Sequence, residues 1–251
     1  MNPIQRETEI LQLLKEKNYA TVDYLAEKIH ISPSSIRRDL TQMESKGLIK
    51  RDHGGASLLP SVPGFAPFFS RLQEGKKEKQ SLAKAASKLV QPNSALFIDS
   101  SSTAMEIYKY LTSEMNLTCF SNNLLLTHLL AARKIKAYSI GGCVSQRNNV
   151  ITTGSYALDM LKSIYVDFMF FSSSSLSQDG VVSDLDENET AIRRFMLSHS
   201  KTKVFLCPDN RFGKLSPFAL CECGDTDYLV SSSDFCENFK KKHSRVTFVR
   251  A

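Results

Sequence analysis

The sequence predicts an α/β protein with a small N-terminal winged helix-turn-helix domain plus a larger, mostly parallel α/β sensor domain. Three observations support this division. Residues 1–58 contain three predicted helices followed by a basic hairpin. A proline-rich stretch follows at 59–78, and strands and helices alternate over residues 79–251. Such alternation is typical of a parallel sheet that is covered by helices on both faces.

The first two helices are predicted from apolar residues at helical spacing. In the first helix, before Asn18, these residues are Ile10, Leu11, Leu13 and Leu14. Thr21 is a suitable N-cap for the second helix. One face of that second helix carries Val22, Leu25, Ala26 and Ile29.

The third helix has the composition of a DNA-recognition helix. Ser32 caps it, Pro33 takes its first position, and Gly47 is predicted to end it. Its apolar stripe is Ile36, Leu40 and Met43. The residues left outside are Ser34, Ser35, Arg37, Arg38, Thr41 and Gln42. Arginine forks grip guanine edges or phosphates, and small hydroxyls let the helix approach the DNA closely.

A hairpin is predicted over residues 48–58, with its turn at Gly54 and Gly55. Lys50, Arg51 and His53 lie on it, and we expect them to form a wing that contacts the DNA backbone or minor groove. The alternative is a small helical domain with solvated arginines, since residues 1–60 hold nine Lys or Arg and eight Asp or Glu, a net of +1 (9 − 8). The order of helix, helix-turn-helix and basic hairpin favours DNA binding.

Two short runs in this region are specific, Ile36-Arg37-Arg38-Asp39-Leu40 and His53-Gly54-Gly55-Ala56. Together with residues 21–27 and 47–49 they resemble the DeoR family of bacterial repressors. The resemblance covers nearly the whole chain and is weaker after residue 80. It implies that the chain represses genes of sugar metabolism, with double-stranded operator DNA as its partner. It also implies a sensor domain similar to the phosphosugar isomerases, which responds to a phosphorylated sugar.

Residues 59–78 are predicted to be a semi-rigid linker because Pro60, Pro63, Gly64 and Pro67 fall within them. In the second domain, residues 79–251, the predicted helices are 82–89, 104–111, 124–132, 157–161 and 187–198. The predicted strands are 95–98, 117–120, 137–140, 166–171, 203–207, 228–230 and 246–248.

Ligands of such sheets bind beyond the carboxyl ends of the strands. The candidate effector residues at these ends are Asp99, Ser100, Ser101, Ser102, Thr103, Asn122, Gly141, Gly142 and Arg211. Backbone N–H groups and a helix dipole after Asp99 suit a phosphate, while Asn122 suits sugar hydroxyls. The two glycines let a ligand approach the backbone, and Arg211 neutralises an anion. Ordinary turn chemistry is the alternative, and the resemblance favours a small anionic metabolite, such as a sugar phosphate.

The chain departs from the family pattern at three places in this presumed pocket. Ser101 stands where the family usually has glycine, at a cost of about 1–2 kcal/mol if the position requires a positive φ. Pro208 and Arg211 stand where Asp and Lys are usual. The run Ser172–Ser175 replaces a loop that contains glycine.

Two other classes of function compete with a ligand-responsive repressor. A phosphosugar isomerase needs a positioned general base, and the carboxylates available by type are Asp99, Asp184, Asp186, Glu187 and Glu189. None stands in a catalytic motif, so we expect no enzyme activity. A ligand-independent DNA-binding regulator with a degenerate pocket is the third class.

Composition bounds the remaining expectations. The net charge is +6, and no apolar run is long enough to cross a membrane, so we expect a cytoplasmic protein that does not bind membranes. The six cysteines lack metal-site spacing and are expected to be reduced, with no metal and no cofactor. One small DNA-binding head makes few contacts, so we expect a homodimer or higher oligomer.

Overall fold

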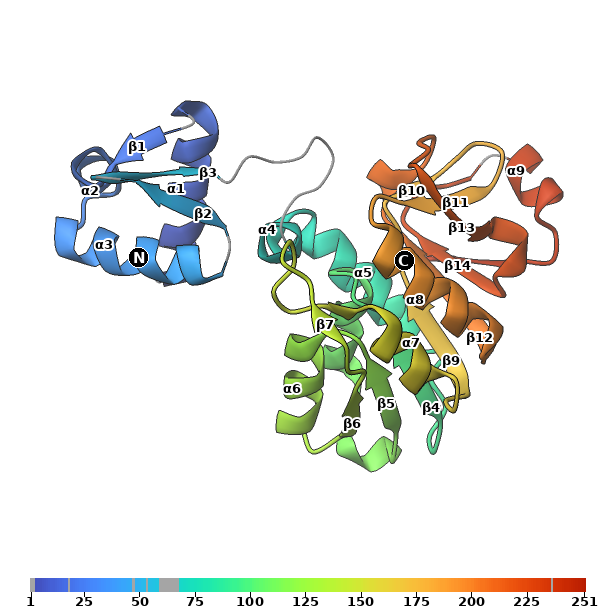
Figure 1. Cartoon of the computed structure of the whole chain (residues 1–251). Coiled ribbons are helices and arrows are strands. Elements are labelled where there is room, and N and C mark those ends of the chain that lie inside the picture. The colour runs from blue at the N-terminus through green and yellow to red at the C-terminus, as the bar shows by residue number, and fades with distance from the viewer. Residues whose placement is uncertain (1–2, 18, 47, 53, 59–67, 236) are drawn as a thin grey trace. The chain divides into compact units, whose positions relative to one another are not determined.

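The computed structural model describes residues 3–17, 19–46, 48–52, 54–58, 68–235 and 237–251 (Figure 1). The chain divides into two compact units. The N-terminal unit comprises residues 1–73 with 147–149, and the larger unit comprises residues 74–146 and 150–251. None of the described helices has the length and apolar character needed to cross a membrane.

The N-terminal unit is a helix-turn-helix with a three-stranded antiparallel sheet, ordered β1-β3-β2. Its elements are α1 (Pro3–Lys17), β1 (Tyr19–Thr21), α2 (Val22–Ile29), α3 (Pro33–Ser45), β2 (Ile49–Asp52), β3 (Gly55–Leu58) and α4 (Phe68–Gln73). The predicted caps are present: the Thr21 side chain accepts from the N–H of Tyr24, and that of Ser32 accepts from the N–H of Ser35. His30 ends α2 in the left-handed region, with φ 57°.

One apolar core holds this unit together. The stripe predicted for the third helix is buried, since Ile36 and Leu40 are 0% exposed and Met43 is 1% exposed. These side chains pack with others from α1, α2 and the sheet, namely Ile10, Leu14, Leu25, Ile29, Ile49 and Ala56. Burial of this stripe forces the opposite face of α3 toward solvent.

The larger unit contains a seven-stranded parallel sheet, ordered β15-β14-β12-β9-β4-β5-β6. Its strands are β4 (Ala95–Ile98), β5 (Thr118–Ser121), β6 (Lys136–Ser139), β9 (Val166–Phe171), β12 (Ser200–Cys207), β14 (Tyr228–Ser231) and β15 (Thr247–Arg250). Its α-helices are α5 (Lys76–Ser87), α6 (Leu124–Ala132), α7 (Ser155–Leu161), α8 (Glu187–Ser198) and α9 (Glu237–Lys242). Short 3₁₀ helices are η1 (Ala104–Tyr110), η2 (Ser113–Met115), η3 (Asp209–Arg211) and η4 (Cys223–Asp225).

Two small antiparallel sheets accompany the large one. One pairs β7 (Cys143–Val144) with β8 (Thr152–Thr153), and the other has the order β10-β11-β13 (Ser175–Leu176, Val181–Asp184 and Phe218–Glu222). The second of these is called the small sheet below. The sequence analysis predicted none of these five strands.

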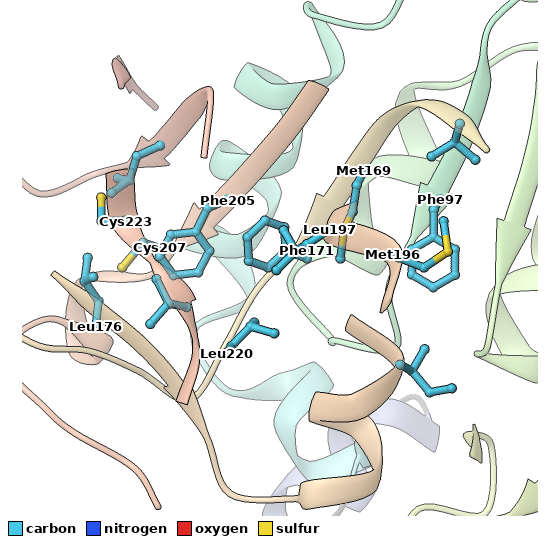
Figure 2. Close-up of a cluster of buried hydrophobic side chains, with 14 of the residues drawn as sticks. Phe97, Met169, Phe171, Leu176, Met196, Leu197, Phe205, Cys207, Leu220 and Cys223 are labelled. Carbon is cyan, nitrogen blue, oxygen red and sulfur yellow. The ribbon is translucent and has the colours of Figure 1, made fainter. Parts of the chain in front are cut away.

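Aromatic side chains fill the core on one face of the parallel sheet. Phe97, Met169 and Phe171 pack there with side chains of α7 and α8 (Figure 2). The rings of Phe171 and Phe205 stack at 5.2 Å between centroids. Neighbouring strand residues point to the opposite face because strand side chains alternate.

The strand order changes direction at the pair β4–β9. From β4 the chain builds outward through β5 to β6, and from β9 it builds outward through β12 and β14 to β15. The carboxyl ends of β4 and β9 therefore form a topological switch point, where α/β sheets hold their ligands.

Several predicted elements need correction. The stretch 59–78 is not linker throughout, because α4 lies within it and α5 begins at Lys76 instead of residue 82. The first residues of α5 are polar, so the apolar pattern did not indicate where the helix begins. Residues 104–111, predicted as a helix of ordinary type, contain the 3₁₀ helix η1. Gly55, predicted to lie in the hairpin turn, belongs to strand β3, and strand β1 was not predicted. Gly47, the predicted end of the third helix, lies outside the described residues.

Candidate DNA-contact surface and effector site

The outward face of α3 carries most of the residues predicted to contact DNA. The side chains of Ser34, Arg37, Arg38 and Gln42 are exposed, and that of Ser35 is half-buried. A basic helix face at this place in a helix-turn-helix unit is suited to the major groove.

Three serine hydroxyls fix the first turn of α3. The Oγ of Ser32 lies 2.9 Å from the Oγ of Ser34 and 3.0 Å from the Oγ of Ser35. It also accepts from the N–H of Ser35 at 3.3 Å. Ser34 and Ser35 therefore complete the cap as well as facing outward.

The acidic residue of α3 is neutralised from α1. Arg6 donates from Nε to Oδ2 of Asp39 at 2.7 Å and from Nη2 to Oδ1 at 3.0 Å. This bidentate pair leaves the charges of Arg37 and Arg38 dominant on the outward face. Sequence reasoning missed Arg6, because it lies 33 residues before Asp39 and no local pattern links them.

The wing is joined to α3 by hydrogen bonds. Nη1 of Arg51 donates to Oγ1 of Thr41 at 2.8 Å, and the backbone N–H of Arg51 donates to Oε1 of Glu44 at 3.0 Å. Lys50 is exposed and lies 3.4 Å from Asp52. His53, also predicted to contact DNA, lies outside the described residues. Arg51 is therefore held against α3, while Lys50 extends toward solvent.

At the switch point, Asp99 has all its acceptor positions filled. Its Oδ1 accepts from the N–H of Ser101 at 3.0 Å and from the Ser101 hydroxyl. Its Oδ2 accepts from Nε of Arg193 at 2.6 Å and from the N–H of Ser172 at 3.4 Å. A carboxylate offers about four acceptor sites, so Asp99 shapes the loop that follows β4 and has no acceptor position left for a ligand.

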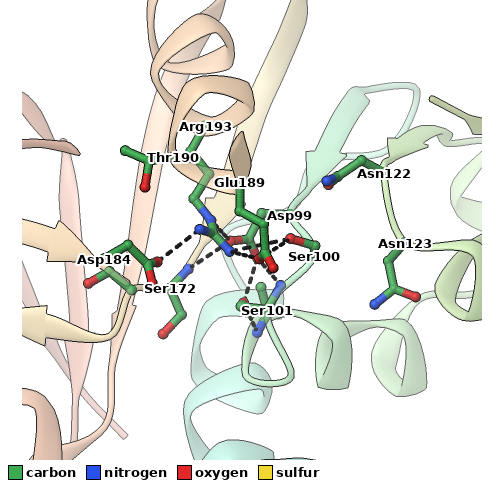
Figure 3. Close-up of polar contacts among 12 residues, drawn as sticks. Asp99, Ser100, Ser101, Asn122, Asn123, Ser172, Asp184, Glu189, Thr190 and Arg193 are labelled. Atoms are coloured by element: carbon green, nitrogen blue, oxygen red, sulfur yellow. Dashed lines mark hydrogen bonds and ion pairs between the residues drawn. The ribbon is translucent and has the colours of Figure 1, made fainter. Parts of the chain in front are cut away.

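Arg193 of α8 is the centre of a buried ion cluster that the sequence analysis missed (Figure 3). Besides Asp99, its Nη1 donates to Oδ2 of Asp184 at 2.8 Å and its Nη2 to Oε2 of Glu189 at 3.1 Å. Nη2 also lies 3.3 Å from the Oγ of Ser100. Burial by itself lowers the pKa of Arg193, but the carboxylates of Asp184, Asp99 and Glu189 outweigh it and raise that pKa above its ordinary value.

The loop after β4 offers hydrogen-bond donors beside a buried lysine. Nζ of Lys79, on α5, donates to the Oγ of Ser102 at 3.1 Å, and the Lys79 residue is 4% exposed. Among the described residues, the backbone N–H groups of Ser102 and Thr103 have no acceptor. Two free N–H groups and an ammonium at one loop suit an anion. Lys79 was noted in the sequence only as part of the family pattern.

Two buried asparagines face this loop (Figure 3). Asn122 donates from Nδ2 to the carbonyl of Thr152 at 3.0 Å, and Asn123 accepts from the N–H of Leu126 at 3.1 Å. The Oδ1 of Asn122 and the Nδ2 of Asn123 are buried and have no partner in the described part of the chain. An unpaired buried polar atom is costly, so each atom is a candidate ligand contact.

The remaining predicted effector residues serve other roles or lie apart. A Cβ on Gly142, which has φ 127°, would lie 2.5 Å from the carbonyl of Thr153, so this glycine lets the β7–β8 hairpin close. Gly141 is exposed, with open space where a Cβ would lie. Arg211 lies in η3, and none of the contacts found among the described residues joins it to the Arg193 cluster.

The serine at position 101 is not strained. Positive φ angles outside glycine occur, among the described residues, at His30, Asn93, Asn116 and Lys134. The Oγ of Ser101 instead accepts from the N–H of Ala104, the first residue of η1, at 3.1 Å. A short 3₁₀ helix at this place supplies less of the aligned dipole on which the predicted phosphate site partly relied.

Comparison with known proteins identifies both units. Residues 6–62 match the DeoR-like helix-turn-helix domain, and residues 74–233 match the DeoR C terminal sensor domain. The chain is 28% identical to the HTH-type transcriptional regulator GolR of Listeria innocua, over 96% of this chain and 95% of that protein. It is 29% identical to the glycerol-3-phosphate regulon repressor of Escherichia coli, over 85% of this chain and 84% of that protein.

These findings, with the helix-turn-helix unit and the α/β unit described above, define a DNA-binding transcriptional regulator that carries a sensor domain. The relatives are named as regulators and repressors, not as enzymes. The chain belongs to the DeoR family.

Proposed function

We propose that this protein is a repressor of sugar metabolism genes whose affinity for operator DNA is set by a small phosphorylated metabolite. The observation that carries the proposal is the buried Lys79 beside the free N–H groups of Ser102 and Thr103. The phosphate lies at these donors. The hydroxyls of the ligand meet the unpaired atoms of Asn122 and Asn123.

DNA is read by the outward face of α3. Arg37 and Arg38 contact base edges or phosphates, while Lys50 and Arg51 of the wing contact the backbone. Replacement of both Arg37 and Arg38 by Ala should weaken operator binding by about 5- to 150-fold, because one bidentate base contact is worth about 1–3 kcal/mol. The double variant Lys240→Ala, Lys241→Ala is the matched control, with the same charge change in the larger unit. Equal operator affinity for the Arg37, Arg38 variant and the wild type, measured at one salt concentration, would show that α3 is not the recognition helix.

The metabolite acts by differential affinity for two states of the protein. The loss of DNA affinity that it causes cannot exceed the ratio of its affinities for the state that binds DNA poorly and the state that binds DNA well. Two heads are needed for tight specific binding, so the protein works as a homodimer or a higher oligomer. Sedimentation equilibrium tests this point, and a monomer at micromolar concentration would contradict it.

The test of the whole proposal is DNA binding to the promoter region upstream of the protein's own gene cluster. The measurement is made with and without a panel of sugar phosphates that includes glycerol 3-phosphate. We expect one compound to weaken binding in the wild type and in Lys84→Met, an exposed substitution on α5. The same compound should have little effect on Lys79→Met. DNA binding that no compound changes would favour the ligand-independent regulator instead.

A further inference from the structure

The buried guanidinium of Arg193 connects three separate elements of the larger unit. Its partners are Asp99 and Ser100 in the loop after β4, Asp184 at the end of β11, and Glu189 one turn earlier on α8. Arg193 is 2% exposed, so water cannot replace a partner that moves away. If one partner shifts, the guanidinium or another partner must therefore move as well.

Ser100 places the cluster next to the proposed ligand. Its hydroxyl donates to Oε2 of Glu189 at 3.1 Å and lies 3.3 Å from Nη2 of Arg193. Ser100 is two residues from Ser102, whose hydroxyl contacts Lys79. An anion that closes on the N–H groups of Ser102 and Thr103 pulls on the same short loop.

Asp184, at the end of β11, is one of the contacts that join the small sheet (β10-β11-β13) to α8. Besides Arg193, it accepts from the hydroxyl of Ser174 at 2.6 Å and from the N–H of Leu185 at 2.8 Å. The next residue inward, Ser183, accepts from the N–H of Ser216 at 2.9 Å. Ser216 follows Leu215, which is 69% exposed although apolar. Ser183 therefore connects β11 to this surface segment by a hydrogen bond next to Asp184.

We propose that Arg193 and Asp184 couple occupancy of the effector loop to the small sheet and its surface segment 213–217. The inference rests on the proposed function, since it takes the loop after β4 as the anion site. Arg193 and Asp184 are positioning residues in this scheme: Arg193 contacts both Asp184 and the loop after β4, and neither residue contacts the ligand.

The variant that tests the coupling is Asp184→Asn. Asparagine keeps an oxygen for Ser174 and Leu185, and it removes the charge that faces Arg193. Two carboxylates remain to hold the guanidinium, so the fold should survive. The matched control is Asp186→Asn, which makes the same charge change two residues away. Asp186 is the N-cap of α8, a place where Asn serves as well as Asp, and it does not contact Arg193 in the described structure.

Amide hydrogen exchange of the full chain is measured with and without inorganic phosphate. In the wild type and in Asp186→Asn, phosphate should slow exchange both in residues 99–104 and in residues 181–185. In Asp184→Asn it should slow exchange in residues 99–104 alone. Where phosphate does slow exchange in residues 99–104 of the wild type, unchanged exchange of residues 181–185 in that protein, or their continued response in Asp184→Asn, would overturn the coupling.

A second comparison needs no ligand, because coupling between two places is reciprocal. Without phosphate, Asp184→Asn should raise exchange in residues 99–104 by roughly tenfold, the factor that corresponds to one charge-assisted hydrogen bond of about 1.4 kcal/mol. Asp186→Asn should not. If phosphate protects nothing but this difference is present, the anion assignment fails and the coupling stands. If exchange in residues 99–104 is the same in both variants, the coupling is wrong.

Discussion

Replacement of Arg193 by Met should be among the most destabilising single changes in the larger unit. The change leaves the carboxylates of Asp99, Asp184 and Glu189 without their common cation, and the three side chains are 1%, 9% and 5% exposed. Breaking a buried ion pair from one side costs about 3–5 kcal/mol, because the remaining charge has neither water nor a partner. Domains are stable by only about 5–15 kcal/mol, so this is a large fraction.

The assay is urea-induced unfolding of the full chain at pH 7, followed by far-ultraviolet circular dichroism. We expect a loss of about 3–5 kcal/mol for Arg193→Met, which corresponds to a fall of about 6–20 °C in Tm for a unit of this size. The neighbouring Arg194→Met is the control, since Arg194 is exposed and donates to the carbonyl of Ala219. It should lose less than about 1 kcal/mol. A loss for Arg193→Met as small as that for Arg194→Met would refute the reasoning that the cluster depends on its guanidinium.

Three further predictions concern the same unit. Gly180→Ala should destabilise the larger unit by more than Gly213→Ala in the same urea assay. Both glycines have positive φ, but a Cβ on Gly180 would lie 2.4 Å from the ring of His243, whereas a Cβ on Gly213 would meet open space. Burial, and then the charge of Lys242, lower the pKa of His243 below 6.5, so the folded state favours the neutral ring. The contribution of His243 to stability is therefore complete above about pH 6.5, and it is lost as the pH falls toward the lowered pKa. The wild type should consequently lose more stability than His243→Leu between pH 7 and pH 5. Parallel curves of stability against pH for the two proteins would contradict this. Iodoacetamide at pH 8 should modify exposed Cys143 well before buried Cys223, because burial raises the pKa of Cys223 to about 12. Peptide mass mapping measures the two rates, and equal rates would show that Cys223 is not shielded.

The regular elements were predictable because their patterns are local. The helices at 124–132 and 187–198 and the strand at 166–171 have the predicted bounds. Each combines an apolar pattern with turn or capping residues at its ends, as in the Asp186 cap of α8. The caps Thr21 and Ser32 were predictable for the same reason. The small sheet was not predictable, because its strands are short and because β11 pairs with β13, a distant segment of the chain.

The candidate effector site was predictable only in its location. The carboxyl ends of the strands indicated the loop after Asp99, but not which groups there are free. Asp99 was predicted as a ligand contact, and its oxygens are filled by partners as distant as Arg193, 94 residues later. Arg193 was missed because an arginine within a helical pattern usually lies at the surface. Which donors remain unpaired is decided by such long-range contacts, and those are absent from any local pattern.

The switch point between β4 and β9 has a consequence for the order in which the protein is made. Synthesis runs from the N-terminus, so the helix-turn-helix unit leaves the ribosome before most of the larger unit. Of the two strands that pair with β4, β9 begins only at Val166, and Arg193 follows later still. The loop after Asp99 cannot take its final form until α8 has been made. A newly synthesised chain therefore has the residues of the proposed DNA-contact face before the loop of the proposed ligand site can be completed.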